Sequence, residues 1–167
     1  KDPIYSCIIG QEGCDVSAIA TFGIEINVLN VYPDEPKSNV FPGWMAAYGL
    51  NEKDPDGTAK KIVVDSVPIS EFNANPNRYL KNGNNWKYDI LVFGFWDCNY
   101  SRDLSQASRD ATEAYLRANK AVVFGHDTIT DYCGNHPQFN SLASYAGLTH
   151  LPNDPNNGNS SYHYPRS

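Results

Sequence analysis

The chain of 167 residues carries 13 basic and 19 acidic side chains, which gives a formal net charge of −6. No cluster of Lys and Arg supplies a basic face, and this argues against nucleic acid or an anionic membrane surface as the partner. No stretch approaches the roughly 20 consecutive apolar residues of a membrane span. The length and the hydrophobic content of 41% predict one folded domain, 1–167, with a core at about 24–148 and peripheral segments at 1–23 and 149–167.

The first half of the chain alternates strand and helix signals. A strand is predicted over 24–31, where β-branched residues stop at Tyr32 and Pro33, and a proline-rich loop follows. A helix is then predicted over 42–50 and a second strand over 61–67. Ser70 is expected to cap a short turn, and a short helix is expected over 76–80.

Residues 88–97 form a near-continuous apolar run that ends in Asp97, Cys98 and Asn99. A run without alternation is typical of a strand covered on both faces, as in a parallel sheet. Ser101 or Asp103 is expected to cap the next helix, which closes at Asn119. The apolar stripe of that helix is predicted to consist of Leu104, Ala107, Ala111, Tyr115 and Ala118.

A second short apolar run, 120–127, follows that helix and ends in polar residues. A last short helix is predicted near 137–146, and the tail from Thr149 onward has no period and is expected to form a loop. The whole order predicts an α/β fold with a three-layer, doubly wound, mainly parallel sheet, flavodoxin-like in the strand order 2-1-3-4. A Rossmann fold is the alternative, but no GxGxxG follows the first strand, which argues against a dinucleotide.

The carboxyl ends of parallel strands meet at one edge of the sheet, where such folds place their sites. The polar residues expected at this edge are Asn30, Tyr32, Asp65, Ser66, Asp97, Cys98, Asn99, His126, Asp127 and Thr128. From these, five side chains are predicted to bind a ligand: Asp97, Asn99, His126, Asp127 and Thr128.

The cysteines Cys7, Cys14, Cys98 and Cys133 are even in number and include no close CxxC pair, which argues against zinc. Disulfides Cys7–Cys14 and Cys98–Cys133 are favoured over the other connectivities, with buried free thiols as the alternative. Disulfides predict an extracellular or cell-surface protein. The start at Lys1, without a methionine, fits a removed leader or a boundary within a larger surface or secreted protein.

Structural and catalytic interpretations of the same residues stay open. Asp97 can accept backbone donors near the following helix, and His126 can be locked by its own loop. Cys98 or Cys133 can act as a nucleophile beside His126. No cofactor is predicted, although Asp97, His126 and Asp127 together suit a divalent cation.

Two of these runs carry a resemblance. Tyr88-Asp-Ile-Leu-Val-Phe-Gly-Phe-Trp-Asp97, a capped helix, and then Ala121-Val-Val-Phe-Gly-His-Asp-Thr128 resemble the class I glutamine amidotransferase-like superfamily over roughly 24–148. The resemblance is to trehalose-utilisation-type domains and to uncharacterised domains of large cell-surface proteins. In the amidotransferases the second run leads into a tight turn that presents a nucleophilic cysteine.

In this chain that turn is Gly125-His126-Asp127, so His126 stands where the resemblance implies the nucleophile. The resemblance therefore implies the fold and not the glutaminase activity. No His-x-Glu pair follows at His136, His150 or His163 to complete a triad. The sequence predicts a non-catalytic extracellular module whose strand ends bind a ligand or another domain of the same chain. A cysteine-dependent hydrolase or amidotransferase-like enzyme, and a structural spacer domain, are the alternatives.

Overall fold

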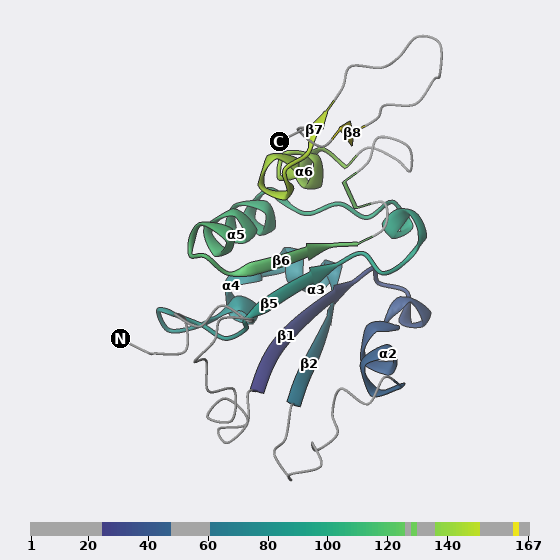
Figure 1. Cartoon of the computed structure of the whole chain (residues 1–167), viewed down its shortest axis with the longest axis vertical. Coiled ribbons are helices and arrows are strands. Elements are labelled where there is room, and N and C mark those ends of the chain that lie inside the picture. Colours follow the sequence, from purple (N-terminus) through teal and green to yellow (C-terminus); the bar gives the residue numbers. More distant parts are fainter. Residues whose placement is uncertain (1–24, 48–60, 126–127, 130–135, 151–161, 164–167) are drawn as a thin grey trace, which may run out of the picture.

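The computed structural model describes residues 25–47, 61–125, 128–129, 136–150 and 162–163 (Figure 1). Its helices are α2 (Phe41–Ala47), α3 (Ile69–Ala74), α4 (Pro76–Leu80), α5 (Gln106–Arg117) and α6 (Pro137–Asn140), with short 3-10 helices η2 (Pro36–Ser38), η3 (Asp97–Ser101) and η4 (Ala143–Ala146). Its strands are β1 (Glu25–Tyr32), β2 (Lys61–Pro68), β3 (Lys81–Asn82), β4 (Asn85–Trp86), β5 (Ile90–Phe93), β6 (Ala121–Phe124), β7 (Thr149–His150) and β8 (Tyr162–His163).

Four parallel strands form the main sheet in the order β2-β1-β5-β6. β1 pairs with β2 along its whole length, and with β5 from Val28 to Val31. The helices flank this sheet, and Figure 1 shows α3 and α4 behind it and α2 beside β2. The prediction of a mainly parallel α/β fold is therefore confirmed.

The two central strands are buried on both faces. All four residues from Val28 to Val31 in β1 are buried, as are Leu91, Val92 and Phe93 in β5. The apolar run around β5 lacks alternation because Leu91, Val92 and Phe93 are all buried, although successive side chains point to opposite faces of the sheet. β6 behaves differently, since its residues alternate between exposed and half-buried and Val123 is 41% exposed.

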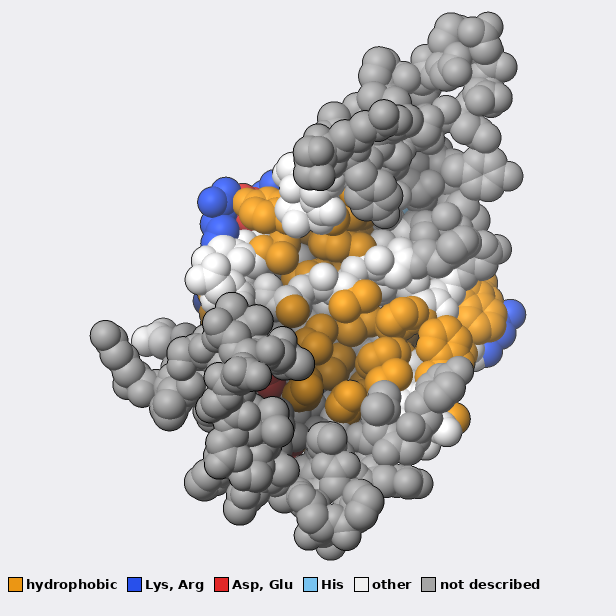
Figure 2. Space-filling view, in the orientation of Figure 1, with side chains coloured by type: hydrophobic (Ala, Val, Ile, Leu, Met, Phe, Trp, Pro, Cys, Tyr) orange, Lys and Arg blue, Asp and Glu red, His pale blue; other side chains and the backbone are white. Residues whose placement is uncertain are grey.

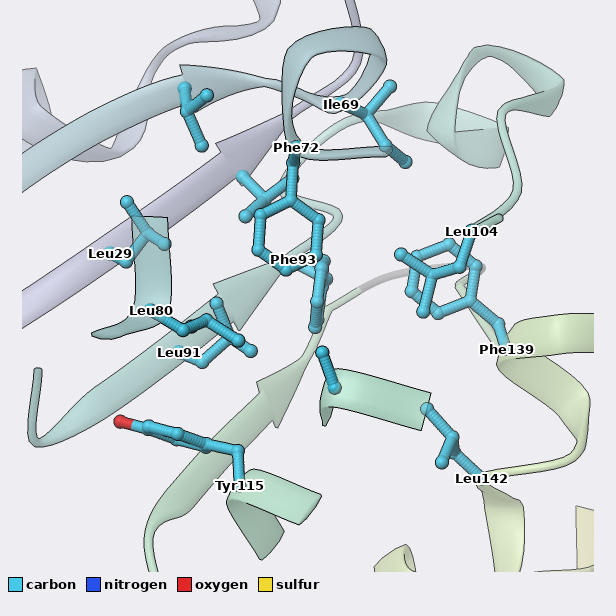
Figure 3. Packing of buried hydrophobic residues seen from close by; sticks show 13 residues of the cluster. Leu29, Ile69, Phe72, Leu80, Leu91, Phe93, Leu104, Tyr115, Phe139 and Leu142 are labelled. Carbon is cyan, nitrogen blue, oxygen red and sulfur yellow. The ribbon is translucent and has the colours of Figure 1, made fainter. Parts of the chain in front are cut away.

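The core lies between the sheet and the helices behind it (Figure 3). Phe93 stands at its centre, with ring contacts to Phe72, Phe124 and Phe139 at centroid distances between 5.2 and 6.1 Å. Burial of a Phe, Leu or Ile side chain contributes roughly 1.5–3 kcal/mol. The other buried members of the cluster are Leu29, Val31, Val67, Ile69, Leu80, Leu91, Leu104, Ala111, Tyr115 and Leu142.

α5 follows the predicted helix, with two differences. Its N-cap is Ser105, whose hydroxyl accepts the backbone N–H of Ser108 at 3.2 Å, rather than Ser101 or Asp103. Its buried face includes Ser108 and Thr112, while Ala107 and Ala118 are exposed. Both buried hydroxyls donate to backbone carbonyl oxygens, so neither hydroxyl is left without a hydrogen-bond partner.

The opposite face of the sheet contacts the first part of the β1–β2 connection, at Asn39. Asn30 alternates with Leu29 and Val31 of the core, so its side chain points to that opposite face. There its amide donates to Asn39, which lies between η2 and α2. The tail predicted as a loop contains a two-residue antiparallel pairing of β7 with β8. In the part of the chain that the structure describes, no helix is both long and apolar enough to span a membrane.

Candidate functional site

The carboxyl end of β5 turns sharply into η3. Gly94, with φ 72°, ends the strand earlier than the apolar run predicts, and η3 begins at Asp97. Asn99, Tyr100 and Ser101 then have φ values of 42°, 48° and 54°. L-residues in this left-handed region cost roughly 1–2 kcal/mol each, and they normally occur singly. The segment after β5 is therefore a strained turn that the surrounding structure has to hold in place.

Asn99, one of the predicted ligand-binding residues, has a buried side chain. It is 1% exposed, and its Nδ2 donates to the carbonyl oxygen of Arg102 at 2.7 Å. Its Oδ1 is buried and accepts no hydrogen bond from any residue that the structure describes. A buried acceptor without a partner costs roughly 1–3 kcal/mol.

Two groups of packed rings come from this turn and from α2, and together we call them the aromatic rim: Phe41, Trp44, Phe95, Trp96 and Tyr100. Phe41 stacks on Phe95 at 4.8 Å, Trp44 meets Phe95 edge-on at 5.5 Å, and Trp96 stacks on Tyr100 at 6.1 Å. Trp44 is 44% exposed. Figure 2 shows hydrophobic side chains over the front of the sheet that continue to the side where α2 lies. Exposed apolar patches of this kind mark binding surfaces more often than single exposed residues do.

Lys37 places a cation beside one ring of the aromatic rim. Its ammonium group lies 5.6 Å from the centre of the Tyr100 ring, a distance that suits a cation–π contact. Interaction with the Tyr100 hydroxyl raises the pKa of Lys37 above its ordinary value, so the side chain stays protonated.

Asn30, Ser66 and Asn39 form a closed polar cluster at the ends of β1 and β2. The Asn30 amide donates to Asn39 at 2.9 Å and to Ser66 at 3.3 Å, and the Ser66 hydroxyl donates to Asn39 at 3.0 Å. These bonds satisfy one another and tie the loop before α2 to the sheet. The cluster is therefore explained by structure without a ligand.

Asp65 lies apart from this cluster, although the sequence places it at the same strand end. Its carboxylate accepts the Tyr88 hydroxyl at 2.8 Å. Burial and this hydrogen bond raise the pKa of Tyr88 above its ordinary value. Asp65 and Asn30 point to opposite faces of the sheet because side chains alternate along a strand. The polar residues at this edge of the sheet therefore lie in two different environments.

The turn after β6 joins Thr128 to His136. Thr128 is fully buried, and its hydroxyl donates to the carbonyl oxygen of Gly125 at 2.9 Å. Its own carbonyl oxygen lies 3.2 Å from Nδ1 of His136. A carbonyl oxygen only accepts, so Nδ1 carries a proton and donates it to Thr128.

His136 is fully buried, and no described residue reaches its Nε2. The sequence did not single out His136 as a binding residue. It precedes Pro137, the first residue of α6, and no spacing to another His, Asp or Glu marks it. Burial and the bond to Thr128 are what distinguish it, and neither is readable from the sequence.

A pocket of about 260 Å³ opens beside the same turn. Its described lining is mostly apolar and comes from β6, from the turn after β6, and from the segment around η4: Val122, Phe124, Gly125, Thr128, Ile129, Ala146 and Leu148.

Several predicted residues lie outside the described residues. His126, Asp127, Cys7, Cys14 and Cys133 do so entirely, and for Asp97 and Cys98 only the backbone is described. The two disulfides, the cysteine nucleophile and the cation set therefore stay predictions. Within the described ranges, no three His, Cys, Asp or Glu side chains gather where they could hold a metal ion.

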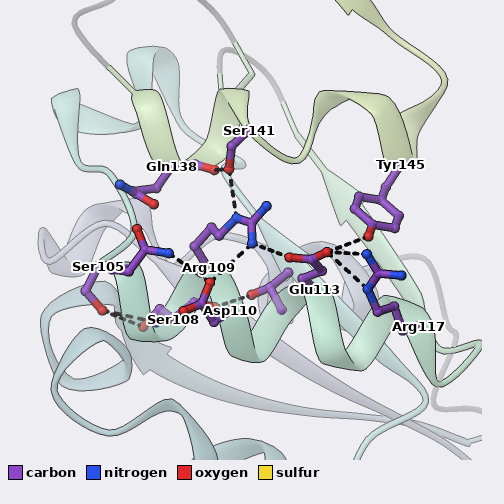
Figure 4. A network of polar contacts seen from close by, with 11 residues as sticks. Ser105, Ser108, Arg109, Asp110, Glu113, Arg117, Gln138, Ser141 and Tyr145 are labelled. Atoms are coloured by element: carbon purple, nitrogen blue, oxygen red, sulfur yellow. Dashed lines mark hydrogen bonds and ion pairs between the residues drawn. The ribbon is translucent and has the colours of Figure 1, made fainter.

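A polar network on α5 is distinct from this site (Figure 4). Glu113 accepts the Tyr145 hydroxyl at 2.7 Å, and it also pairs with Arg117 at 2.6 Å and with Arg109. The Tyr145 hydrogen bond, together with both arginines, lowers the pKa of Glu113 from 4.5 to about 2. Arg109 also donates to Ser141 at 2.9 Å, so the network holds the segment after α6 against α5.

The fold and the site together define an α/β protein whose strand ends carry a strained turn, an aromatic rim and two buried polar atoms without described partners. No family model matches the sequence, and comparisons with curated proteins and with solved structures found no significant match.

Proposed function

We propose that this chain is a non-catalytic extracellular α/β module that binds a ligand or a neighbouring domain at the carboxyl ends of its strands. The main support for this proposal is that two buried polar atoms, Asn99 Oδ1 and His136 Nε2, have no partner among the described residues. Asn99 follows β5 and His136 follows β6. Native proteins leave few buried polar atoms unpaired, and each one calls for a ligand, an ion, a water or a strain-based explanation.

Two further features support this location. The left-handed turn from Asn99 to Ser101 stores backbone strain at the end of β5, and strain of this kind concentrates at binding and switch regions. The aromatic rim beside it leaves Trp44 exposed. Aromatic rings provide large apolar contact areas at low entropic cost, which suits a recognition surface. Asp97, His126 and Asp127 remain the residues proposed to contact the ligand, with Thr128 and Asn99 as supporting residues.

The amidotransferase-like ancestry is part of the same proposal. In the sequence, His126 stands where the resemblance implies the nucleophile. This suits a domain that keeps the binding surface of the superfamily and lacks its glutaminase reaction. Titration of thiols in native and denatured protein tests whether the protein lacks a catalytic cysteine. No thiols in either state agrees with two disulfides, whereas a reactive thiol at Cys98 or Cys133 in the native state would favour the cysteine-dependent enzyme.

Ligand binding is tested by the rise in melting temperature across a panel of sugars, amino acids, short peptides and divalent cations. Asp97→Ala and His126→Ala are each expected to abolish the rise produced by a hit while leaving the melting temperature of the free protein nearly unchanged. Asp110→Ala, on the exposed side of α5, is the matched control and should keep the rise. A large loss of stability in the first two variants would show that these residues are structural and would remove the proposal.

A further inference from the structure

β6 is the edge of the sheet in the part of the chain that the structure describes. β5 pairs with it on one side, and no described strand pairs with its other side. Backbone N–H and C=O groups on an open strand edge are a ready template for pairing with another chain. The side chains of β6 alternate between exposed and half-buried, so one face of this strand is open, with Val123 41% exposed.

The pairing with β5 decides which groups of β6 are open. Ala121 donates its N–H to Asp89 at 3.4 Å, and Gly125 donates its N–H to Phe93 at 2.8 Å. Alternate residues of a strand direct their backbone groups to the same side, so Ala121, Val123 and Gly125 face β5. The N–H and C=O groups of Val122 and Phe124 therefore face outward.

The pocket of about 260 Å³ adjoins β6. Val122 and Phe124 line it together with Ala146 and Leu148 of the segment around η4. Its volume is below the lower limit of roughly 300 Å³ for sites that enclose a whole small ligand. The hydroxyl of Thr128, the one polar side chain in the described lining, is already bonded to Gly125. The space therefore suits a single apolar side chain that arrives on a backbone.

We infer that the outer edge of β6 binds an extended polypeptide segment of a partner, which pairs with Val122 and Phe124 and places one apolar side chain in this pocket. Backbone pairing supplies affinity and the pocket supplies selectivity in this mode of recognition. Because Ala146 and Leu148 line the same pocket as β6, a partner has to fit between them and the strand, which suits one extended segment rather than the whole sheet edge of a second copy. The inference rests on the proposed function, because it names the class of partner that the module takes.

Amide hydrogen exchange of the free full-length chain gives the first readout. The amides of Val122 and Phe124 are expected to exchange at least about 10-fold faster than the amide of Val123, which donates into the sheet. Equal protection that does not change with protein concentration would show that the chain covers its own edge. Protection that grows with concentration would show a second copy there. Either result overturns the inference.

A library of random linear heptapeptides, selected against the immobilised chain, provides the partner. Selected peptides are expected to share one apolar residue and to slow exchange at Val122 and Phe124 by at least about 10-fold. Ala146→Phe, which fills the pocket, should weaken binding at least about 10-fold, as expected for loss of a buried apolar anchor. Ala107→Phe, exposed on α5, is the matched control and should not weaken it.

Methylating the backbone nitrogens on alternate residues of a selected peptide gives a test that leaves the protein unaltered. One of the two methylation registers should abolish binding and the other should keep it, because only alternate groups of a strand face its neighbour. Peptides that instead protect the amides of Phe95 and Trp96 would keep the proposed binding function and overturn the β6 inference. Failure to enrich any peptide would overturn the β6 inference, and ligand hits lost in Asp97→Ala would still support the strand-end site.

Discussion

Gly125 packs directly against Gly94 where β5 and β6 end. A Cβ atom added at Gly125 would lie 2.2 Å from the carbonyl oxygen of Gly94 and 2.8 Å from that of Phe93. Real Cβ atoms essentially never approach backbone this closely, so the two strand ends meet at a distance that only glycine permits. This contact positions the turns that lead to Asp97 on one strand and to Thr128 on the other.

Gly125→Ala is expected to destabilise the protein by about 1–3 kcal/mol, because rigid backbone rather than a movable side chain has to shift. Chemical denaturation measures the change. Gly43→Ala in α2 is the matched control, since a Cβ there meets nothing within 4 Å. It should instead stabilise by roughly 0.5–1 kcal/mol through helix propensity. A Gly125→Ala variant as stable as the parent would contradict the tight contact.

The sequence predicts the strands of the main sheet well because apolar runs and β-branched residues report burial directly. It places the end of β5 too late because Phe95 and Trp96 continue the apolar run. The Phe95 ring stacks on Phe41 and the Trp96 ring stacks on Tyr100, and both residues lie beyond the end of β5. Only the positive φ of Gly94 separates the two roles, and a glycine in an apolar run does not reveal its φ.

The N-cap of α5 and the burial of His136 also depend on tertiary contacts that the sequence does not reveal. Three residues within five positions, Ser101, Asp103 and Ser105, have the chemistry of an N-cap. Asp103 is used elsewhere, because its carboxylate accepts the N–H groups of Gln138 and Phe139. That long-range pairing has no sequence signal, so the choice of Ser105 could not be predicted. The burial of His136 is hidden for the same reason.

The left-handed turn after β5 predicts a specific ranking of variants. Asn99→Gly and Asn99→Ala lose the same amide, but only glycine removes the strain of a Cβ at φ 42°. The glycine variant is therefore expected to be more stable than the alanine variant by roughly 1–2 kcal/mol. Asn119, with φ 58° after α5, should show the same ranking. If the alanine variant at Asn99 equals the glycine variant in thermal unfolding, the turn is not strained.

We expect the carboxylate of Asp103 to stabilise α6. Its carboxylate accepts the N–H of Gln138 at 2.9 Å and that of Phe139 at 3.1 Å, so it caps a helix that is distant in sequence. Asp103→Ala should destabilise by about 1–2 kcal/mol, in the range of lost N-caps. Asp110→Ala, exposed on α5, should change the unfolding free energy by less than about 0.5 kcal/mol. Equal effects of the two substitutions in urea unfolding would show that the cap contributes nothing.

We expect the folded protein to lose stability in acid because Glu113 becomes protonated. The Tyr145 hydroxyl and the two arginines hold the pKa of Glu113 at about 2 in the folded protein, against 4.5 ordinarily. A carboxyl with a lowered folded pKa contributes stability above its ordinary pKa, and this contribution is lost as the pH falls toward the folded pKa. Between about pH 4.5 and 2, the parent should therefore lose more stability than Glu113→Gln.

The measurement is urea unfolding at several pH values for the parent, Glu113→Gln and Tyr145→Phe. The parent should be more stable than Glu113→Gln near pH 6, and the difference should shrink toward pH 2. Tyr145→Phe removes the largest cause of the shift and should move this loss to higher pH. Glu25→Gln, which removes an exposed carboxylate on β1, is the control and should leave the difference unchanged. A gap between the parent and Glu113→Gln that stays constant from pH 6 to 2 would mean that Glu113 titrates alike in the folded and unfolded chain, and the network in Figure 4 would then not stabilise its charge.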